Sequence, residues 1–109
     1  MTFVATRPPG TVQTLADFFG FLTLTIEANV SKFPPTIIFH NKNDLVVPVA
    51  NSKKLDQLLS GTIDHQLVEP YDEHWQEVNH AFKPGGPADV DSRAKTADWF
   101  IKHLPPTGT

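Results

Sequence analysis

The sequence predicts an α/β fold in which three mainly parallel strands alternate with helices. Short β-branched and apolar runs alternate with segments whose apolar residues recur at helical spacing, and Pro and Gly residues separate these segments. The chain has 109 residues, of which 39% are hydrophobic, and this suits a single folded domain over residues 1–109. Because strands joined through helices pair in parallel by right-handed crossovers, we expect the order strand, helix, strand, helix, strand, long loop, helix.

The N-terminal part predicts a short strand and a long helix. Residues 2–6 have the composition of a strand, and residues 11–32 carry apolar side chains at helical spacing. The alternation over residues 22–26 also permits a strand, but we interpret the whole segment as helix. The apolar residues at helical spacing are Val12, Leu15, Phe19, Leu22, Ile26 and Val30.

The central part predicts a buried strand followed by a helix. Residues 36–40 form a compact β-branched and aromatic run directly after two prolines. Asn51 or Ser52 is expected to cap the next helix, and Gly61 to end it. The apolar residues of this helix are Leu55, Leu58 and Leu59.

The C-terminal part predicts one more strand, a long loop and a final helix. The strand covers residues 65–69 and the irregular stretch covers residues 70–87. Asp89 or Asp91 is expected to open the last helix, and two prolines stop it. Its expected buried stripe is Ala94, Ala97, Trp99 or Phe100, Ile101 and Leu104.

The charges and the missing cysteines exclude several classes of protein. Nine Lys and Arg against twelve Asp and Glu give a net charge of −3, and the cations are spread along the chain, so we expect no nucleic-acid partner and no basic membrane-surface helix. Without cysteine, a disulfide framework, a thiolate metal site and a Cys nucleophile are excluded. No apolar run approaches the roughly 18 to 20 residues of a membrane span, and the N-terminus lacks a signal-peptide pattern, so we expect a cytoplasmic protein.

Two polar side chains follow neighbouring predicted strands. Asp44 lies in the loop after residues 36–40, and His80 lies in the long loop after residues 65–69. Adjacent strands lie about 4.8 Å apart, so the two side chains can meet where the strands end, and the carboxylate would orient the imidazole. Alternatively, Asp44 only forms an Asx-turn, and His74 competes with His80 for the role of base.

Five marker motifs follow one another between residue 34 and residue 104. They are Pro-Pro-Thr-Ile-Ile-Phe-His, Asn-Asp-Leu-Val-Val-Pro-Val, Asn-His-Ala-Phe, Ser-Arg-Ala and Trp-Phe-Ile-Lys-His-Leu, in this order. Together they resemble the C-terminal half of the dienelactone hydrolase family, within the α/β-hydrolase superfamily. The resemblance implies a partial α/β-hydrolase fold, with residues 1–33 as first strand and helix and residues 105–109 as a tail. It implies that Asp44 is the triad acid and His80 the triad base of a hydrolase of small esters or lactones, without cofactor or metal.

Two features depart from the family pattern. Asn41 stands where such proteins usually carry Gly, and because Asn tolerates left-handed backbone the turn is expected to survive. The nucleophile elbow, G-x-S-x-G or its Cys version, is absent, because none of the four serines is flanked by glycines at two residues. The elbow supplies the hydroxyl and an oxyanion-hole donor worth roughly 3 to 4 kcal/mol, so we expect the chain to be inactive without an N-terminal half that supplies both.

The remaining predictions concern metal binding, the other histidines and self-association. A crowded acidic segment (Asp72, Glu73, His74, Glu77 and His80) lacks the H-E-x-x-H spacing, and we expect no metal there. His40 is expected to be a satisfied, partly buried histidine. The alternative function is a non-catalytic α/β module that forms a homodimer, either through the edge of residues 3–6 or through the Phe-rich segment at residues 18–24.

Overall fold

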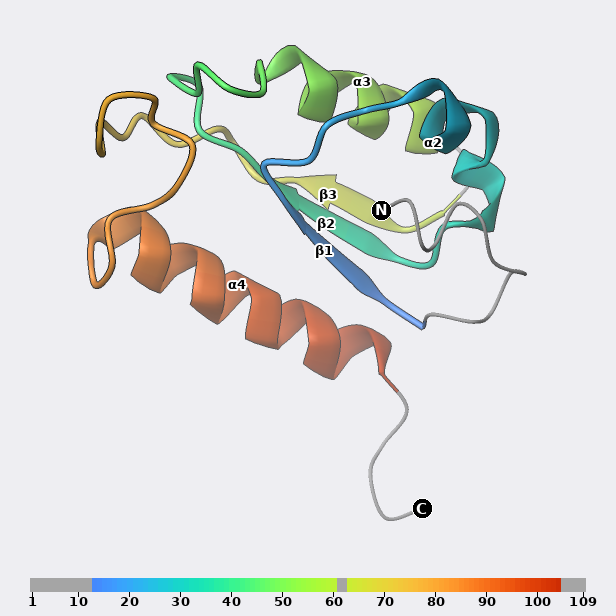
Figure 1. Ribbon diagram of the computed structural model, residues 1–109. Helices are drawn as coiled ribbons and strands as arrows, with labels where there is room; N and C mark the ends of the chain where they lie inside the picture. Colours follow the sequence, from blue (N-terminus) through green and yellow to red (C-terminus); the bar gives the residue numbers. More distant parts are fainter. Residues whose placement is uncertain (1–12, 61–62, 105–109) are drawn as a thin grey trace.

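The computed structural model describes residues 13–60 and 63–104 of the chain (Figure 1). Its elements, in chain order, are β1 (Leu15–Phe18), α2 (Leu24–Ala28), the 3₁₀ helix η1 (Val30–Lys32), β2 (Thr36–Phe39), α3 (Ala50–Leu59), β3 (His65–Leu67) and α4 (Pro87–His103). The strand expected at residues 2–6 lies outside the described residues, as do Gly61 and the C-terminal prolines.

The three strands form one parallel sheet in the order β1-β2-β3. Figure 1 shows α2 and α3 on one face of the sheet and α4 on the other, so the domain has three layers. An isolated bridge between Asn41 and Tyr71 extends the pairing of β2 and β3 beyond the strands. The prediction of a small α/β domain with three parallel strands alternating with helices is therefore confirmed.

The prediction of one helix over residues 11–32 is wrong. Its first half holds the strand β1, whose residues pair in register from Leu15 with Thr36 to Phe18 with Phe39. Phe19 then adopts a left-handed backbone with φ 58°, which a continuing helix could not contain. Only α2, capped by the Thr23 side chain, and η1 are helical. The apolar residues do recur at helical spacing, but pairing with β2 makes the segment a strand. Local spacing could not predict this, because it contains no information about contacts with other parts of the chain.

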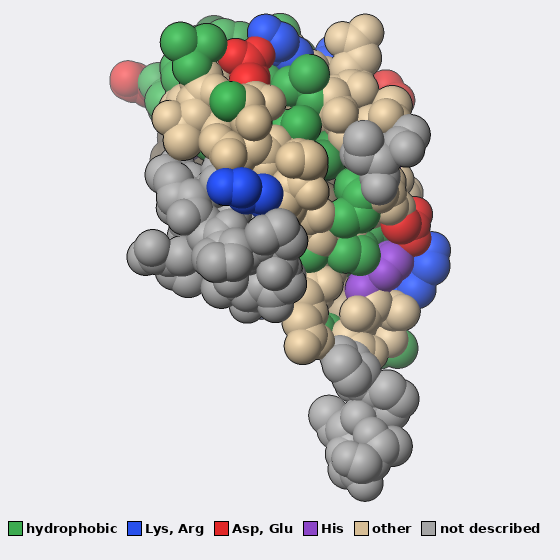
Figure 2. All heavy atoms as spheres, turned by 90° about the vertical axis from the view of Figure 1, so that its right-hand side faces the viewer, with side chains coloured by type: hydrophobic (Ala, Val, Ile, Leu, Met, Phe, Trp, Pro, Cys, Tyr) green, Lys and Arg blue, Asp and Glu red, His purple; other side chains and the backbone are tan. Residues whose placement is uncertain are grey.

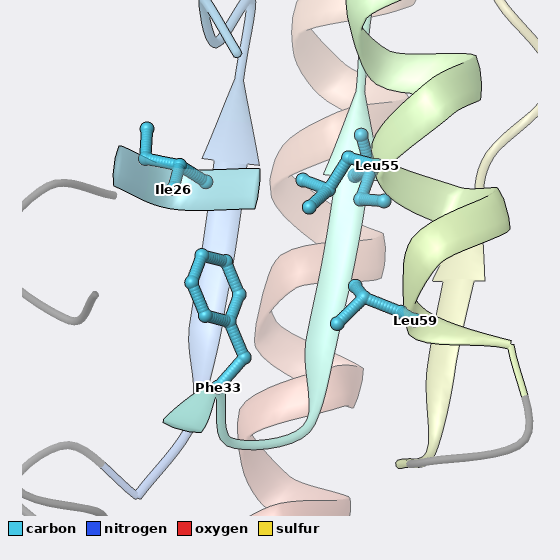
Figure 3. Packing of buried hydrophobic residues seen from close by; sticks show 5 residues of the cluster. Ile26, Phe33, Leu55 and Leu59 are labelled. Carbon is cyan, nitrogen blue, oxygen red and sulfur yellow. The ribbon is translucent and has the colours of Figure 1, made fainter. Parts of the chain in front are cut away.

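The core lies on both faces of β2, whose four residues are all buried. Ile38 faces the α2–α3 layer, where Ile26, Phe33, Leu55 and Leu59 pack around it (Figure 3). On the opposite face, between the sheet and α4, the buried cluster consists of Ile37, Phe39, Val68 and Trp99. Alternate residues of a strand point to opposite faces, so this β-branched and aromatic run supplies both halves of the core.

The second helix is confirmed, but its expected cap is wrong. The residue before α3 is Val49, which makes no side-chain cap bond. Ser52 lies buried in the first turn, and its hydroxyl bonds to a histidine instead. Asn51 accepts the backbone N–H of Leu22 at 3.1 Å and so joins α3 to the segment before α2.

The final helix begins at Pro87 after Gly86, two residues before the earlier of the two expected start positions. Its buried residues are Ala88, Ser92 and Trp99. Of the two aromatic residues offered for the buried stripe, Trp99 is buried and Phe100 is half-buried. The aliphatic part of that prediction is wrong, because Ala94, Ala97, Ile101 and Leu104 are exposed. The side of α4 that carries the large Trp99 ring faces the sheet, where the ring is buried. The aliphatic residues lie on the opposite side of the helix and therefore face away from the sheet.

Candidate active site

The carboxylate and the imidazole singled out from the sequence meet beyond the carboxyl ends of β2 and β3. The Nδ1 atom of His80 lies 2.7 Å from Oδ2 of Asp44. The Asp44 side chain is fully buried, whereas the His80 side chain is 38% exposed. The pair is therefore anchored from within the protein and open to solvent on the imidazole side.

The loop around Asp44 fixes its carboxylate tightly. Oδ1 accepts the backbone N–H groups of Val46 and Val47, each at 2.8 Å. Burial alone would raise the pKa of Asp44, but the N–H of Val47, the His80 imidazole and the N–H of Val46 together hold this pKa below its usual value. Asp44 thus forms the Asx-turn expected of a loop residue and still presents Oδ2 to His80.

A second histidine lies behind the same carboxylate. His40 is fully buried, with Nε2 2.7 Å from the Val47 carbonyl and Nδ1 2.6 Å from the Ser52 hydroxyl. A carbonyl can only accept, so Nε2 carries the proton, and Nδ1 accepts the hydrogen bond from Ser52. The Nε2 atom also lies 3.3 Å from Oδ2 of Asp44. His40 is the satisfied histidine that was expected, and it supports the turn that holds Asp44.

Two buried asparagines hold the loops of the site together. The Asn41 Oδ1 accepts the N–H of Glu73 at 3.0 Å, and its Nδ2 donates to the carbonyls of Glu73 at 2.6 Å and Asn79 at 3.2 Å. Asn79 has a left-handed backbone, and its side chain bonds to the backbone of Asn43 and Trp75. The asparagines thereby fix the backbone directly before His80.

The expected role of Asn41 is thus corrected. The left-handed residues outside glycine are Phe19, Gln76 and Asn79 in the described part of the chain, so Asn41 does not replace a glycine by adopting that conformation. Its fully buried amide instead serves as a hydrogen-bonding clamp. The signal that could have revealed it was an amide directly at the end of a buried strand, where an unpaired polar group would be costly.

An aromatic pair lies beside His80, with one of its two rings against the imidazole. The Phe19 ring centroid lies 5.5 Å from the His80 ring and 4.7 Å from that of Phe82. Phe19 follows β1, Asp44 follows β2 and His80 follows β3, so all three strands contribute a residue beyond their carboxyl ends. We call this edge of the sheet the rim. The Nε2 atom of His80 has no hydrogen-bond partner within residues 13–60 and 63–104. A neutral His80 that donates from Nδ1 to Asp44 would present Nε2 as a base on the open side.

The competing histidine lies apart from Asp44. The His74 side chain is 77% exposed, and its only ionic neighbour among the described residues is Asp72, at 3.9 Å. Within the described parts of the chain, no group of three or more His, Asp or Glu side chains is arranged to hold a metal ion. The crowded acidic segment therefore consists of separate surface contacts, such as Asn43 with Asp72 and Glu73 with the backbone of Lys83.

None of the serines that the structure describes contacts His80. The hydroxyl of Ser52 bonds to His40, that of Ser60 to the Asp56 carbonyl and that of Ser92 to the Asp89 carbonyl. Ser31 lies in η1, on the far end of the sheet from the rim. The described site thus contains an acid and a base but no hydroxyl that the base could activate.

The positive charges do not gather on the surface that Figure 2 shows. On that face, Lys and Arg side chains lie in separate places rather than in one basic patch. No helix within the described ranges is both long and apolar enough to cross a bilayer.

Comparison of the chain with family models, with curated proteins and with solved structures finds no match.

Proposed function

We propose that this chain supplies the acid and base of a serine or cysteine hydrolase similar to dienelactone hydrolases, acting on small esters or lactones. The observation that carries the proposal is the 2.7 Å contact between Asp44 Oδ2 and His80 Nδ1, with Nε2 left open on a partly exposed ring. The ordered markers that resemble the family support it. The nucleophile would come from a polypeptide segment outside the 109 residues, because the sequence contains no elbow.

The proposed chemistry follows from the two ends of the imidazole. Nε2 of His80 accepts the proton of an attacking hydroxyl or thiol and later gives it to the leaving oxygen of the ester. Asp44 keeps the Nδ1 proton in place and stabilises the imidazolium that forms between these steps. The two N–H groups at Oδ1 hold the carboxylate still, so little reorganisation is needed when the charge on His80 changes.

A chimera tests the proposal directly. The N-terminal half of a dienelactone hydrolase, through its elbow and the following helix, is joined to this chain, and hydrolysis of p-nitrophenyl acetate is measured. We expect turnover that falls by about 10³- to 10⁴-fold with His80→Ala or Asp44→Ala. The matched control is His74→Ala, a loop histidine that is 77% exposed and does not contact Asp44, and it should leave turnover unchanged.

Two results would count against this function. One is a folded, active chimera whose turnover does not respond to His80→Ala. The other is ester turnover by the isolated chain that His80→Ala abolishes, because this would mean that the site is complete without an added nucleophile.

A second candidate function is a non-catalytic module that forms a homodimer. The observation that favours it is the number of large apolar side chains left exposed on the described surface, among them Ile101 at 79% and Val90 at 59%. This candidate is compatible with the first, because the exposed residues of α4 lie on its side away from the sheet and not at the rim that holds His80.

A further inference from the structure

The outer face of α4 carries an apolar stripe that no other helix or strand of the described residues covers. In Figure 1 α4 lies under the sheet, and no described helix or strand lies on its far side. Val90 is 59% exposed, Ile101 79% and Leu104 44%, and Ala94 and Ala97 are exposed between them. We call these five residues the α4 stripe. Sequence spacing assigned four of its members, all except Val90, to the core, and they lie on the opposite side of the helix from the buried residues.

The spacing of the α4 stripe is that of a coiled-coil seam. Its four members within the helix, Val90, Ala94, Ala97 and Ile101, are separated by four, three and four residues, which is a heptad pattern, and Leu104 follows at the helix C-cap. The residues directly opposite are Ser92 and Trp99, seven positions apart, and both are buried against the sheet. One side of α4 thus belongs to the domain core, and the other has the pattern that packs against a second helix.

The charged residues beside the α4 stripe indicate which helix fits. Arg93 and Asp98 flank the stripe on opposite sides and are five residues apart, the separation at which side chains pair across a parallel two-stranded coiled coil. In a parallel dimer each Arg93 would lie next to the partner's Asp98, so the contact would occur twice, once on each side of the seam. Asp98 has no ionic partner within the described residues. Arg93 donates from Nε to Asp89 Oδ1 at 2.9 Å, and its side chain remains 77% exposed.

The antiparallel arrangement fits the same surface poorly. When two copies of a helix pair antiparallel, each flank meets the same flank of the other copy. Asp91 and Asp98 share one flank of the α4 stripe, so this arrangement would place carboxylates against carboxylates. Like charges across an interface disfavour that geometry, and charge complementarity therefore selects the parallel one.

We propose that a second copy of this chain covers the α4 stripe, forming a parallel, twofold symmetric helix pair with reciprocal Arg93–Asp98 contacts. The proposal locates the self-association named above and does not depend on any hydrolase activity. A seam of about two heptads would be too short for isolated peptides. Here α4 is already ordered by its packing on the sheet, so association does not have to order the helix.

Sedimentation equilibrium of the full chain tests the interface. We expect a concentration-dependent dimer of the 12.1 kDa chain, and Ala97→Glu should raise the dimer dissociation constant by at least ~10-fold because it places a charge in the seam. The control is Ala50→Glu, at an exposed position where α3 begins, which should leave the dissociation constant unchanged. Far-UV circular dichroism of both variants verifies that they are folded.

Disulfide trapping tests whether the two α4 helices pair in parallel. Because the chain has no native cysteine, only the introduced cysteines can form a disulfide. In the parallel pair Val90 faces the partner's Val90, so Val90→Cys should form a disulfide dimer under mild oxidation, and Ala50→Cys should not. In an antiparallel pair the two copies of residue 90 lie far apart, and a mixture of Val90→Cys and Ile101→Cys would cross-link instead. That heterologous cross-link, or a strictly monomeric chain at all concentrations, would overturn the proposal.

Discussion

Two buried aspartates, at the ends of neighbouring strands, show how differently the two flanks of this sheet are completed. Asp44, beyond β2, has both carboxylate oxygens bonded, and its pKa is held below the usual value. Asp17, on the edge strand β1, is 5% exposed, and its Oδ2 has no hydrogen-bond partner. Burial raises the pKa of Asp17 to about 6, although the backbone N–H of Gly20 opposes the shift.

The contrast extends beyond the two carboxyl groups. Every residue of β2 is buried, and Asn41, Asn79 and His40 make hydrogen bonds to polar groups of the adjoining loops. In the described part of the chain, β1 pairs on one side only, and Phe18 and Phe21 beside it are 41% and 58% exposed. The rim that holds His80 is therefore internally supported, whereas the flank at β1 is not.

The largest expected effect compares the two strands through one aromatic pair. Phe39 is fully buried, and Phe18 stacks on it at 4.7 Å while remaining 41% exposed. Phe39→Ala should lower the free energy of unfolding by about 3–5 kcal/mol. Phe18→Ala should cost only about 1–2 kcal/mol, because much of its area is already in water. Urea denaturation measures both, and equal losses would contradict the contrast.

The next effect concerns Asp17 and has a defined dependence on pH. The unfolded pKa is near 3.8 and the folded one near 6, so stability from this group is present below pH 3.8 and lost as the pH rises to 6. The difference corresponds to about 3 kcal/mol as an upper bound. Asp17→Asn should therefore stabilise the protein at pH 7 and have little effect at pH 3.5.

The exposed residue Asp98 provides the control for this comparison, since Asp98→Asn should not alter stability at either pH in dilute, monomeric samples. Thermal denaturation at the two pH values distinguishes the cases. An Asp17→Asn variant that is less stable than the parent at pH 7 would show that the β1 carboxylate has a partner that compensates its burial.

A smaller effect tests the support of the rim. Asn41→Gly restores the residue that the resemblance suggests and removes four hydrogen bonds made by a fully buried amide. We expect a loss of about 1–3 kcal/mol and faster amide exchange in the loop before His80. The exposed neighbour Lys42 is the control, and Lys42→Gly should not change exchange at Asn79. If Asn41→Gly were neutral, the clamp described here would be wrong.

The sequence predicted those parts of the molecule whose cause is local. The run of residues in β2 is β-branched or aromatic at every position, so a buried strand could be inferred without knowing its neighbours. The meeting of Asp44 and His80 could also be inferred, because parallel strands bring their carboxyl ends to one edge. The family marker motifs narrowed the choice between His74 and His80 but could not supply the distance.

The sequence failed where a contact from elsewhere decides the outcome. Leu15 and Phe19 have helical spacing, yet β2 pairs with the segment and makes it a strand. Trp99 determines which side of α4 meets the sheet, so the regular stripe that includes Ile101 remains exposed. The amide clamp of Asn41 depends on Glu73, thirty-two residues away, and no spacing rule points to it.

The most direct test of the central claim is the tautomer of His80, measured by long-range ¹H–¹⁵N NMR at a pH where the ring is neutral. We predict a protonated Nδ1 and an unprotonated Nε2, because the carboxylate of Asp44 accepts from Nδ1 at 2.7 Å. This preference should weaken in Asp44→Ala and persist in Asp72→Ala, which removes the neighbour of His74. A neutral His80 that carries its proton on Nε2 in the parent protein would contradict the account.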